Sequence, residues 1–365
     1  MKITKVIPRV VRRDMEGRVW NPRTRWQEKV MVLVFLEADT GHLGVGEAWN
    51  TAASPQALVA TIEDDLARLV IGEDPFFVER VWQRVFRPTE LSSRTGIVAA
   101  ALSAIDTALW NLRSQALGVP LYRLLGAHAE EVYCYASAGL YGEGKTPDAL
   151  GQEMAGYVAQ GFTGVKMKVG GAPRVEDVRR VAAVREAIGP EVRLMVDAVY
   201  NLTVPEALRL ARALEPHDVY WLEAPVSPYD VAGQARIHAA SPIPVCGNET
   251  EYGLDRFREL ITAHAVEFVQ FDVAACGGIS EGRRIADLAR AFRRPCSLHA
   301  ASSAVVMAAS LHLGAAVANC DSVEYHMLHQ WLWDRVPAGT FAPRQGYVRP
   351  PSGPGLGLAL TPDDV

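Results

Sequence analysis

Ionisable residues recur through the second half of the chain at intervals of about one strand–helix unit. They lie 23 to 29 residues apart, and each ends or closely follows a short apolar run: Lys168, Asp197, Glu223, Glu249, Asp272, His299 and Glu324. In a closed parallel barrel of alternating strands and helices, the carboxyl ends of all strands meet at one mouth, where active sites lie. The spacing therefore predicts that these seven side chains converge on one site.

Three consecutive members of this series are carboxylates, namely Asp197, Glu223 and Glu249. Coulomb repulsion prevents three carboxylates from crowding together unless a cation or protons neutralise them. A set of oxygen ligands favours Mg²⁺, which keeps coordination positions open for water or substrate. We therefore predict a Mg²⁺ site formed by these three residues. For Glu249 taken alone, an acid at a helix N-terminus is the ordinary alternative.

Two lysines, Lys166 and Lys168, lie in an apolar run between Gly161 and Gly170. On a strand, side chains two residues apart point to the same face and lie roughly 7 Å apart. Repulsion between two such ammonium groups would lower the pKa of one of them by roughly 1.7 units, which makes that lysine a better base. The alternative is an exposed edge strand with two surface lysines.

Asp272 and His299 end consecutive runs on the other side of the carboxylate trio. A carboxylate beside a histidine fixes the ring tautomer and raises the histidine pKa. His299 would then face Lys168 across the metal as an acid or a base. The alternative is a core histidine that hydrogen-bonds to the backbone. His326 and His329 follow in an aromatic segment, and we assign them no chemistry.

The elements that position these residues are eight apolar runs that alternate with amphipathic helices. The runs cover residues 132–136, 165–169, 193–197, 219–223, 244–249, 267–272, 295–299 and 322–324. This pattern predicts a (β/α)8 barrel of the TIM type. An open doubly wound sheet is disfavoured, because no Gly-x-Gly-x-x-Gly motif follows the first strand.

The first 125 residues have a different pattern of predicted secondary structure. Residues 3–12 and 29–49 favour strands, with a turn at 39–41, and residues 54–125 favour helices with a face of small side chains. We expect an α+β unit here. The segment 14–27 between the strands is polar and contains tryptophan and arginine, which indicates an exposed loop.

Composition excludes several classes of protein. The net charge of −5 argues against a nucleic-acid partner. The N-terminus has no apolar stretch typical of a signal peptide, and the run 31–36 is far too short to span a membrane. The five cysteines are dispersed and form no Cys-x-x-Cys motif, so we expect reduced thiols in a cytoplasmic protein without a zinc site.

Taken together, these residues resemble the enolase superfamily, in its mandelate racemase-like subgroup, over nearly the whole chain. The resemblance is carried by Lys166-x-Lys168, the Asp197/Glu223/Glu249 series, the Asp272 and His299 pair, the segment 277–281 (GGISE), the segment 101–110 (ALSAIDTALW) and the tail 353–357 (GPGLG). Two positions depart from the family pattern. Asn111 stands where an acid is usual, and Asn201 lies later than the usual asparagine after the third strand.

The resemblance implies an α+β capping domain of residues 1–128, completed by the tail 336–365, over a catalytic barrel of residues 129–335. Lys168 would abstract the α-proton of a small-molecule carboxylate, while Lys166 lowers its pKa and contacts the substrate carboxylate. Mg²⁺ would stabilise the resulting enediolate. Glu324, in its protonated form, would hydrogen-bond to the substrate carboxylate. A homo-oligomer is also expected.

His299 permits two reactions. As an acid it would protonate a departing β-hydroxyl, so that an acid sugar (an aldonate, an aldarate or a tartrate-like acid) is dehydrated. As a second base it would support racemisation or epimerisation of a 2-hydroxy acid. We favour dehydration, because it is the commoner chemistry of the subgroup. The polar 14–27 loop also suits a hydroxylated substrate, and the expected substrate contacts are Trp20, Arg23, Arg25 and Arg94.

Two further possibilities differ in class. The related cycloisomerase subgroup is disfavoured, because it has a lysine near the position of His299 and the segment 296–300 contains none. A catalytically silent binding protein on the same scaffold is the last alternative. The intact set of Lys168, His299 and three carboxylates argues against it.

Overall fold

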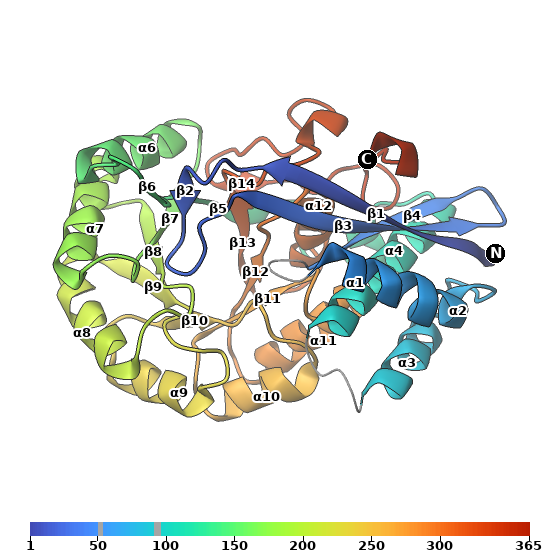
Figure 1. Cartoon of the computed structure of the whole chain (residues 1–365), viewed down its shortest axis with the longest axis horizontal. Coiled ribbons are helices and arrows are strands. Elements are labelled where there is room, and N and C mark those ends of the chain that lie inside the picture. Colours follow the sequence, from blue (N-terminus) through green and yellow to red (C-terminus); the bar gives the residue numbers. More distant parts are fainter. Residues whose placement is uncertain (50–53, 91–95) are drawn as a thin grey trace.

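The computed structural model describes residues 1–49, 54–90 and 96–365. In Figure 1 the strands of a barrel are surrounded by helices, and a smaller unit containing the N-terminal sheet packs beside the barrel. Within the described ranges, none of the helices combines the length and the apolar composition needed to cross a lipid bilayer. The predicted (β/α)8 barrel with an α+β cap is confirmed.

The capping unit is built on an antiparallel sheet in the order β1 (Ile3–Asp14), β3 (Glu28–Ala38) and β4 (Leu43–Ala48). Its helical part, in chain order, consists of α1 (Pro55–Ala60), the π-helical turn Thr61–Leu66, α2 (Ala67–Val70), α3 (Val78–Thr89), α4 (Ile97–Ala116) and α5 (Leu121–Leu124).

The small side chains of α4 allow this helix to lie directly against β4. Cβ atoms added at Gly44 and Gly46 would clash with the carbonyl oxygens of Ala108 and Ala104. Side chains on either surface would hold the helix and strand apart, so glycine and alanine are required together. The helix face predicted from the sequence is therefore the one that packs on the sheet.

Eight parallel strands form the barrel, and the last pairs with the first to close it. They are β5 (Val132–Ser137), β7 (Gly164–Lys168), β8 (Arg193–Asp197), β9 (Val219–Glu223), β10 (Val245–Gly247), β11 (Phe268–Asp272), β12 (Cys296–His299) and β13 (Cys320–His326). The surrounding helices are α6 (Pro147–Ala159), α7 (Arg174–Ile188), α8 (Val204–Leu214), α9 (Val231–Ala240), α10 (Leu254–Thr262), α11 (Gly278–Ala291) and α12 (Ala304–Gly314).

Two strand ends differ from the prediction. β10 ends at Gly247, so Glu249 lies in the loop two residues beyond the strand. β13 continues past Glu324 to His326, because its last residues pair with β5 across the closure of the barrel. That pairing is not visible in the local sequence pattern.

The 14–27 segment is also more ordered than an exposed loop. Its strand β2 (Val19–Trp20) pairs antiparallel with β6 (Tyr141–Gly142), which follows the first barrel strand. Polarity alone suggested a free loop, but the backbone of the segment is hydrogen-bonded to the barrel. This pairing holds the 14–27 segment against the chain that follows the first barrel strand.

A buried polar contact joins the cap to the barrel. Asp106 on α4 accepts hydrogen bonds from the backbone N–H of Ser280 (2.8 Å) and from its hydroxyl (2.6 Å). The Ser103 hydroxyl accepts from the N–H of Gly277 (2.9 Å), and the indole of Trp110 donates to Ser280 Oγ (2.8 Å). The segments 101–110 and 277–281, both singled out in the sequence, therefore bind each other.

The C-terminal tail contacts both units. Its strand β14 (Tyr347–Val348) pairs with β5, whereas the N–H of Leu356 donates to Asn111 Oδ1 on α4 (2.9 Å). Asn111, a departure from the family pattern, thus accepts a backbone bond in this chain. The boundaries at residues 128 and 335 remain predictions.

Candidate active site

The ends of the barrel strands bring the predicted residues together. The strand register places Lys168 beside Asp197, Asp197 beside Glu223, and Asp272 beside His299. Lys166, Glu223 and Glu324 are fully buried, and the other predicted catalytic and metal residues are at least nine-tenths buried. Below them, the barrel is filled by a cluster of apolar side chains: Tyr135, Met195, Trp221, Cys246 and Phe268.

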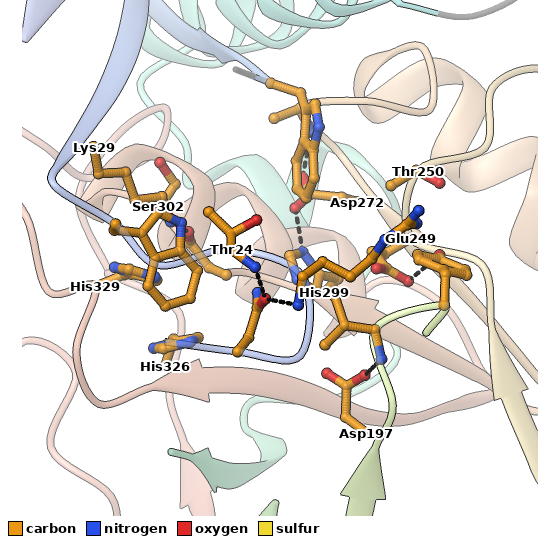
Figure 2. A pocket seen from close by; sticks show the side chains of 18 of the residues that line it. Thr24, Lys29, Asp197, Glu249, Thr250, Asp272, His299, Ser302, His326 and His329 are labelled. Carbon is orange, nitrogen blue, oxygen red and sulfur yellow. Dashed lines mark hydrogen bonds and ion pairs between the residues drawn. The ribbon is translucent and has the colours of Figure 1, made fainter. Parts of the chain in front are cut away.

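A pocket of about 380 Å³ opens above this floor, between the barrel and the cap. Figure 2 shows Asp197, Glu249, Asp272 and His299 around it. Lys168 also lines the pocket, whereas Lys166, Glu223 and Glu324 lie beneath its lining. The seven side chains predicted from spacing thus lie at one mouth of the barrel.

Each of the two lysines is paired with carboxylates. Lys166 Nζ lies 2.5 Å from Glu223 Oε1 and 3.1 Å from Glu324 Oε1, and Lys168 Nζ binds Asp197. Burial alone would lower the pKa of Lys166, but Glu223 and Glu324 outweigh it and raise this pKa well above its ordinary value. Mutual repulsion between bare lysines, the expectation from the sequence, is not the dominant interaction, because carboxylates surround Lys166.

The three predicted metal ligands each face a hydrogen-bond donor. Lys168 binds Asp197, Lys166 binds Glu223, and the Tyr200 hydroxyl donates to Glu249 Oε2 (2.5 Å). Among the residues that the structure describes, no group of three or more His, Cys, Asp or Glu side chains is arranged to hold a metal ion. The assignment of the three ligands therefore stays a prediction.

The chemistry of the donor set nevertheless fits a divalent cation. Burial and repulsion from Asp197 and other carboxylates raise the pKa of Glu223 to about 7, although Lys166 opposes this. Burial also raises the pKa of Glu249, against the opposing effect of His299. A nearby cation stabilises the charged form of buried carboxylates whose pKa is raised. Oxygen ligands of this kind suit Mg²⁺.

His299 is held between two carboxylates. Its Nδ1 lies 2.6 Å from Asp272 Oδ2, and its Nε2 lies 3.3 Å from Glu324 Oε2. Burial lowers the pKa of His299, but Glu324 and Asp272 outweigh burial and raise the pKa to about 9. The Trp49 ring from the cap lies 5.3 Å from the imidazole ring and covers it. The two carboxylates thus favour the protonated form of the buried imidazole at neutral pH.

Glu324 lies between Lys166 and His299. Burial would raise its pKa, but Lys166 and His299 outweigh burial and lower the pKa well below the ordinary value. In the structure the Glu324 carboxylate lies between two cations, and the protonated form expected when it contacts a substrate carboxylate stays a prediction.

Of the predicted substrate contacts in the cap, some line the pocket and others lie outside it. Arg23 lines the pocket, together with its neighbours Asn21, Thr24 and Trp26. The Trp20 ring instead stacks on Tyr141 (centroids 6.5 Å apart), and Arg25 pairs with Glu143 (2.5 Å), so both are outside the pocket. Arg94 lies outside the described residues.

Several lining residues were not predicted: Lys29, Glu47, Trp49, Tyr200, His326 and His329. For one of them, His326, the sequence pattern could have predicted its place in the pocket. His326 is two residues beyond Glu324 on the same strand, and the period of two places both side chains on the inner face. Lys29 and Glu47 have no comparable sequence signal, since they reach the pocket only through the packing of the cap on the barrel.

Comparison with known proteins agrees with this geometry. Residues 149–365 match the family model described as enolase C-terminal domain-like, and residues 9–126 match the mandelate racemase/muconate lactonizing enzyme N-terminal domain. The chain therefore belongs to the enolase superfamily, in its mandelate racemase-like subgroup.

Relatives within the family carry different activities. The chain is 33% identical to the arabinonate dehydratase of Saccharolobus solfataricus, over 90% of this chain and 88% of that protein. It is also 33% identical to the D-galactarolactone cycloisomerase of Agrobacterium fabrum, over 100% of this chain and 97% of that protein. Dehydratases of L-talarate/galactarate, D-xylonate and L-rhamnonate are further relatives.

Solved structures show the same architecture. A racemase from Streptomyces coelicolor A3(2) with bound magnesium is 31% identical, with a TM-score of 0.90 over 98% of this chain and 97% of that chain. The fold is thus shared along the full length of both proteins, and the comparison includes a magnesium-bound member.

Proposed function

We propose that this chain is a Mg²⁺-dependent dehydratase of an acid sugar. The observation that carries the proposal is the position of His299, which is held between Asp272 and Glu324 with a raised pKa. β13 and β5 separate its strand from the strand of Lys168 in the closed barrel, so the acid and the proposed base approach the pocket from different sides. The dehydratases among the relatives support the same chemistry.

Mg²⁺ held by Asp197, Glu223 and Glu249 would supply the positive charge that offsets the second negative charge on the substrate carboxylate. Asp197 now binds Lys168. A cation held by Asp197 would compete with this bond, which would leave the amine of Lys168 free to face the substrate. Lys166 stays charged, because its pKa is raised, and it remains a donor near the carboxylate end of the substrate.

The proposed reaction moves two protons. Lys168 Nζ takes the α-proton, and the electron pair of the broken C–H bond forms a carbon–carbon double bond. His299 then gives its proton to the β-hydroxyl, the C–O bond breaks, and water leaves. The enol product becomes a 2-keto-3-deoxy acid by tautomerisation. Asp272 accepts a hydrogen bond from Nδ1, which leaves the proton on Nε2 for transfer.

Racemisation or epimerisation is the second candidate, and the racemase among the structural relatives favours it. In that reaction His299 returns its proton to the α-carbon instead of to an oxygen. Both reactions use the same residues, so the product must be measured.

The test is a screen of mono- and diacid sugars with Mg²⁺ in deuterium oxide. A dehydratase gives a 2-keto acid, whereas a racemase gives a deuterated epimer without water loss. If no acid in the library exchanges its α-proton, the silent binding protein is the correct interpretation. Cytoplasmic location and homo-oligomeric assembly remain proposals.

A further inference from the structure

A second group of polar side chains lines the pocket on the side away from Glu249. Figure 2 shows Lys29, His326 and His329 gathered there, across the pocket from Glu249 and Thr250. Lys29 lies in the capping strand β3, His326 ends the barrel strand β13, and His329 follows it. We call these three residues the distal cluster. The proposed reaction uses none of them.

Lys29 has no ion pair with a carboxylate among the residues that the structure describes. Its Nζ donates to the carbonyl oxygen of Ala301 (2.6 Å) and lies 5.9 Å from the centroid of the Trp331 ring. An ammonium group has three N–H donors, so two remain for a ligand. Burial, opposed by Glu47 and other acids, lowers the pKa of Lys29 to about 7.

The nearby acids are already bound to other groups. Both carboxylate oxygens of Glu47 accept hydrogen bonds, from the hydroxyls of Ser302 and Ser303. Asp272 binds His299, and Glu324 lies between Lys166 and His299. Lys29 therefore faces the pocket with donors that the described acids do not take.

His326 adds a neutral donor beside Lys29. Its Nδ1 accepts a hydrogen bond from the N–H of Leu328 (3.2 Å), so in the neutral ring the hydrogen is on Nε2. Burial lowers the pKa of His326 well below its ordinary value, which keeps the ring neutral. The Nε2–H group is thus fixed as a donor by the backbone.

His329 completes the cluster. It is 3% exposed, and in the part of the chain that the structure describes its Nδ1 has no hydrogen-bond partner. Its ring lies 4.1 Å from that of His326, and the Trp26 ring of the cap packs against its edge (5.7 Å). A buried nitrogen without a partner is unfavourable, and a polar ligand can supply the missing hydrogen bond.

We propose that the distal cluster binds a second carboxylate of the substrate, so that the enzyme acts on diacid sugars. This inference rests on the proposed function, in which the carboxylates Asp197, Glu223 and Glu249 define the end of the pocket that takes the reacting carboxylate. The opposite end then receives the far end of an extended substrate.

A carboxylate fits the cluster better than a hydroxyl does. A carboxylate has only acceptors, and it can take the two remaining donors of Lys29 together with Nε2–H of His326. Its negative charge also balances the buried ammonium group. A terminal hydroxyl brings no negative charge that would favour the protonated form of Lys29.

The test compares sugar acids that differ only in their last carbon. Dissociation constants of galactarate and galactonate, of xylarate and xylonate, and of the other stereoisomer pairs of these lengths are measured by calorimetry on the Mg²⁺-loaded full chain. We expect the diacid of at least one pair to bind ten-fold or more tightly than its monoacid.

In Lys29→Met that preference should disappear, and Lys29→Arg, which keeps the charge, should retain part of it. Thr24→Val, at the pocket wall outside the cluster, is the matched control and should retain the preference.

Two results would overturn the proposal. One is a wild-type protein that binds the monoacid as tightly as the diacid in every pair, and this result needs no variant. The other is a Lys29→Met protein that loses affinity equally for both members of a pair, because the lysine would then only order the pocket. A diacid preference without any α-proton exchange would support the distal cluster and reject the proposed dehydratase.

Discussion

His299 Nδ1 lies 2.6 Å from Asp272 Oδ2, and these two residues occupy paired positions at the ends of adjacent strands. Asp272 Oδ1 in turn accepts the N–H of Ala274 (2.7 Å), so the carboxylate is fixed by the backbone that follows its strand. The pair therefore sets the orientation of the imidazole as well as its charge, and the Nε2 side faces Glu324.

The first prediction concerns the pH dependence of this pair. The pKa of His299 is raised to about 9, so the ring is protonated at neutral pH and loses its proton as pH rises through that value. A reaction that needs His299 as an acid should lose kcat/KM on the alkaline side. Bound Mg²⁺ weakens the attraction of the neighbouring carboxylates for the proton, so the limb should lie at or below about pH 9.

Asp272→Asn removes a negative charge but keeps the size of the side chain. The pKa of His299 should fall, the alkaline limb of kcat/KM should move to lower pH, and kcat at neutral pH should drop about 100-fold or more. Exposed Asp287→Asn is the control and should leave the profile unchanged. An alkaline limb that stays in place in Asp272→Asn would show that another group titrates.

A second prediction separates the roles of the acid and the base. In His299→Asn the amine of Lys168 is still present, so α-proton exchange into deuterium oxide should persist while 2-keto acid formation falls by about 100-fold or more. In Lys168→Met both signals should vanish. If exchange disappears in His299→Asn and survives in Lys168→Met, the two assignments are reversed.

Much of this site could be predicted because its residues recur at the ends of successive barrel strands. The ends of parallel strands meet at one mouth, so a repeat of about 26 residues was enough to bring Lys168, Asp197 and His299 together. Close packing was also readable, since the alanine-rich face of α4 meets the glycines of β4.

The remaining features depend on contacts that spacing does not encode. The partner of Lys166 depends on side-chain conformations within the barrel, and Lys29 reaches the pocket only because β3 of the cap lies near the loop that follows β12. The 14–27 segment likewise looked like a free loop, because its pairing partner at 141–142 is far away in the chain. The correct partners follow from tertiary packing.

The third prediction tests the metal ligands through stability. The pKa values of Glu223 and Glu249 are raised, so these carboxylates carry negative charge unfavourably and a bound cation should stabilise the fold. At a Mg²⁺ concentration 100 times the Kd, the expected gain is about 2.7 kcal/mol. The measurement is thermal or denaturant unfolding in excess Mg²⁺ and after chelation, for the wild type and for Glu223→Gln.

The gain should be lost in Glu223→Gln and kept in Asp255→Asn, whose carboxylate is 87% exposed. Activity should also disappear on chelation and return on addition of Mg²⁺. Equal stabilisation of the wild type and Glu223→Gln would place the cation elsewhere.

The last prediction concerns the contact between cap and barrel. Asp106 accepts two hydrogen bonds from Ser280 in a buried position, so Asp106→Ala leaves the N–H of Ser280 without this partner. Loss of two hydrogen bonds to a buried carboxylate should reduce the free energy of unfolding by about 3 kcal/mol. Ser280→Ala keeps the backbone bond but removes the hydroxyl, which also accepts from the Trp110 indole, so it should cost less, about 2 kcal/mol. Denaturant unfolding of both variants measures the difference.

The cap supplies Lys29, Trp26 and Trp49 to the pocket, so a loosened cap should raise KM more than it lowers kcat. Equal losses of stability in the two variants, with KM unchanged, would show that Asp106 does not hold the cap in place.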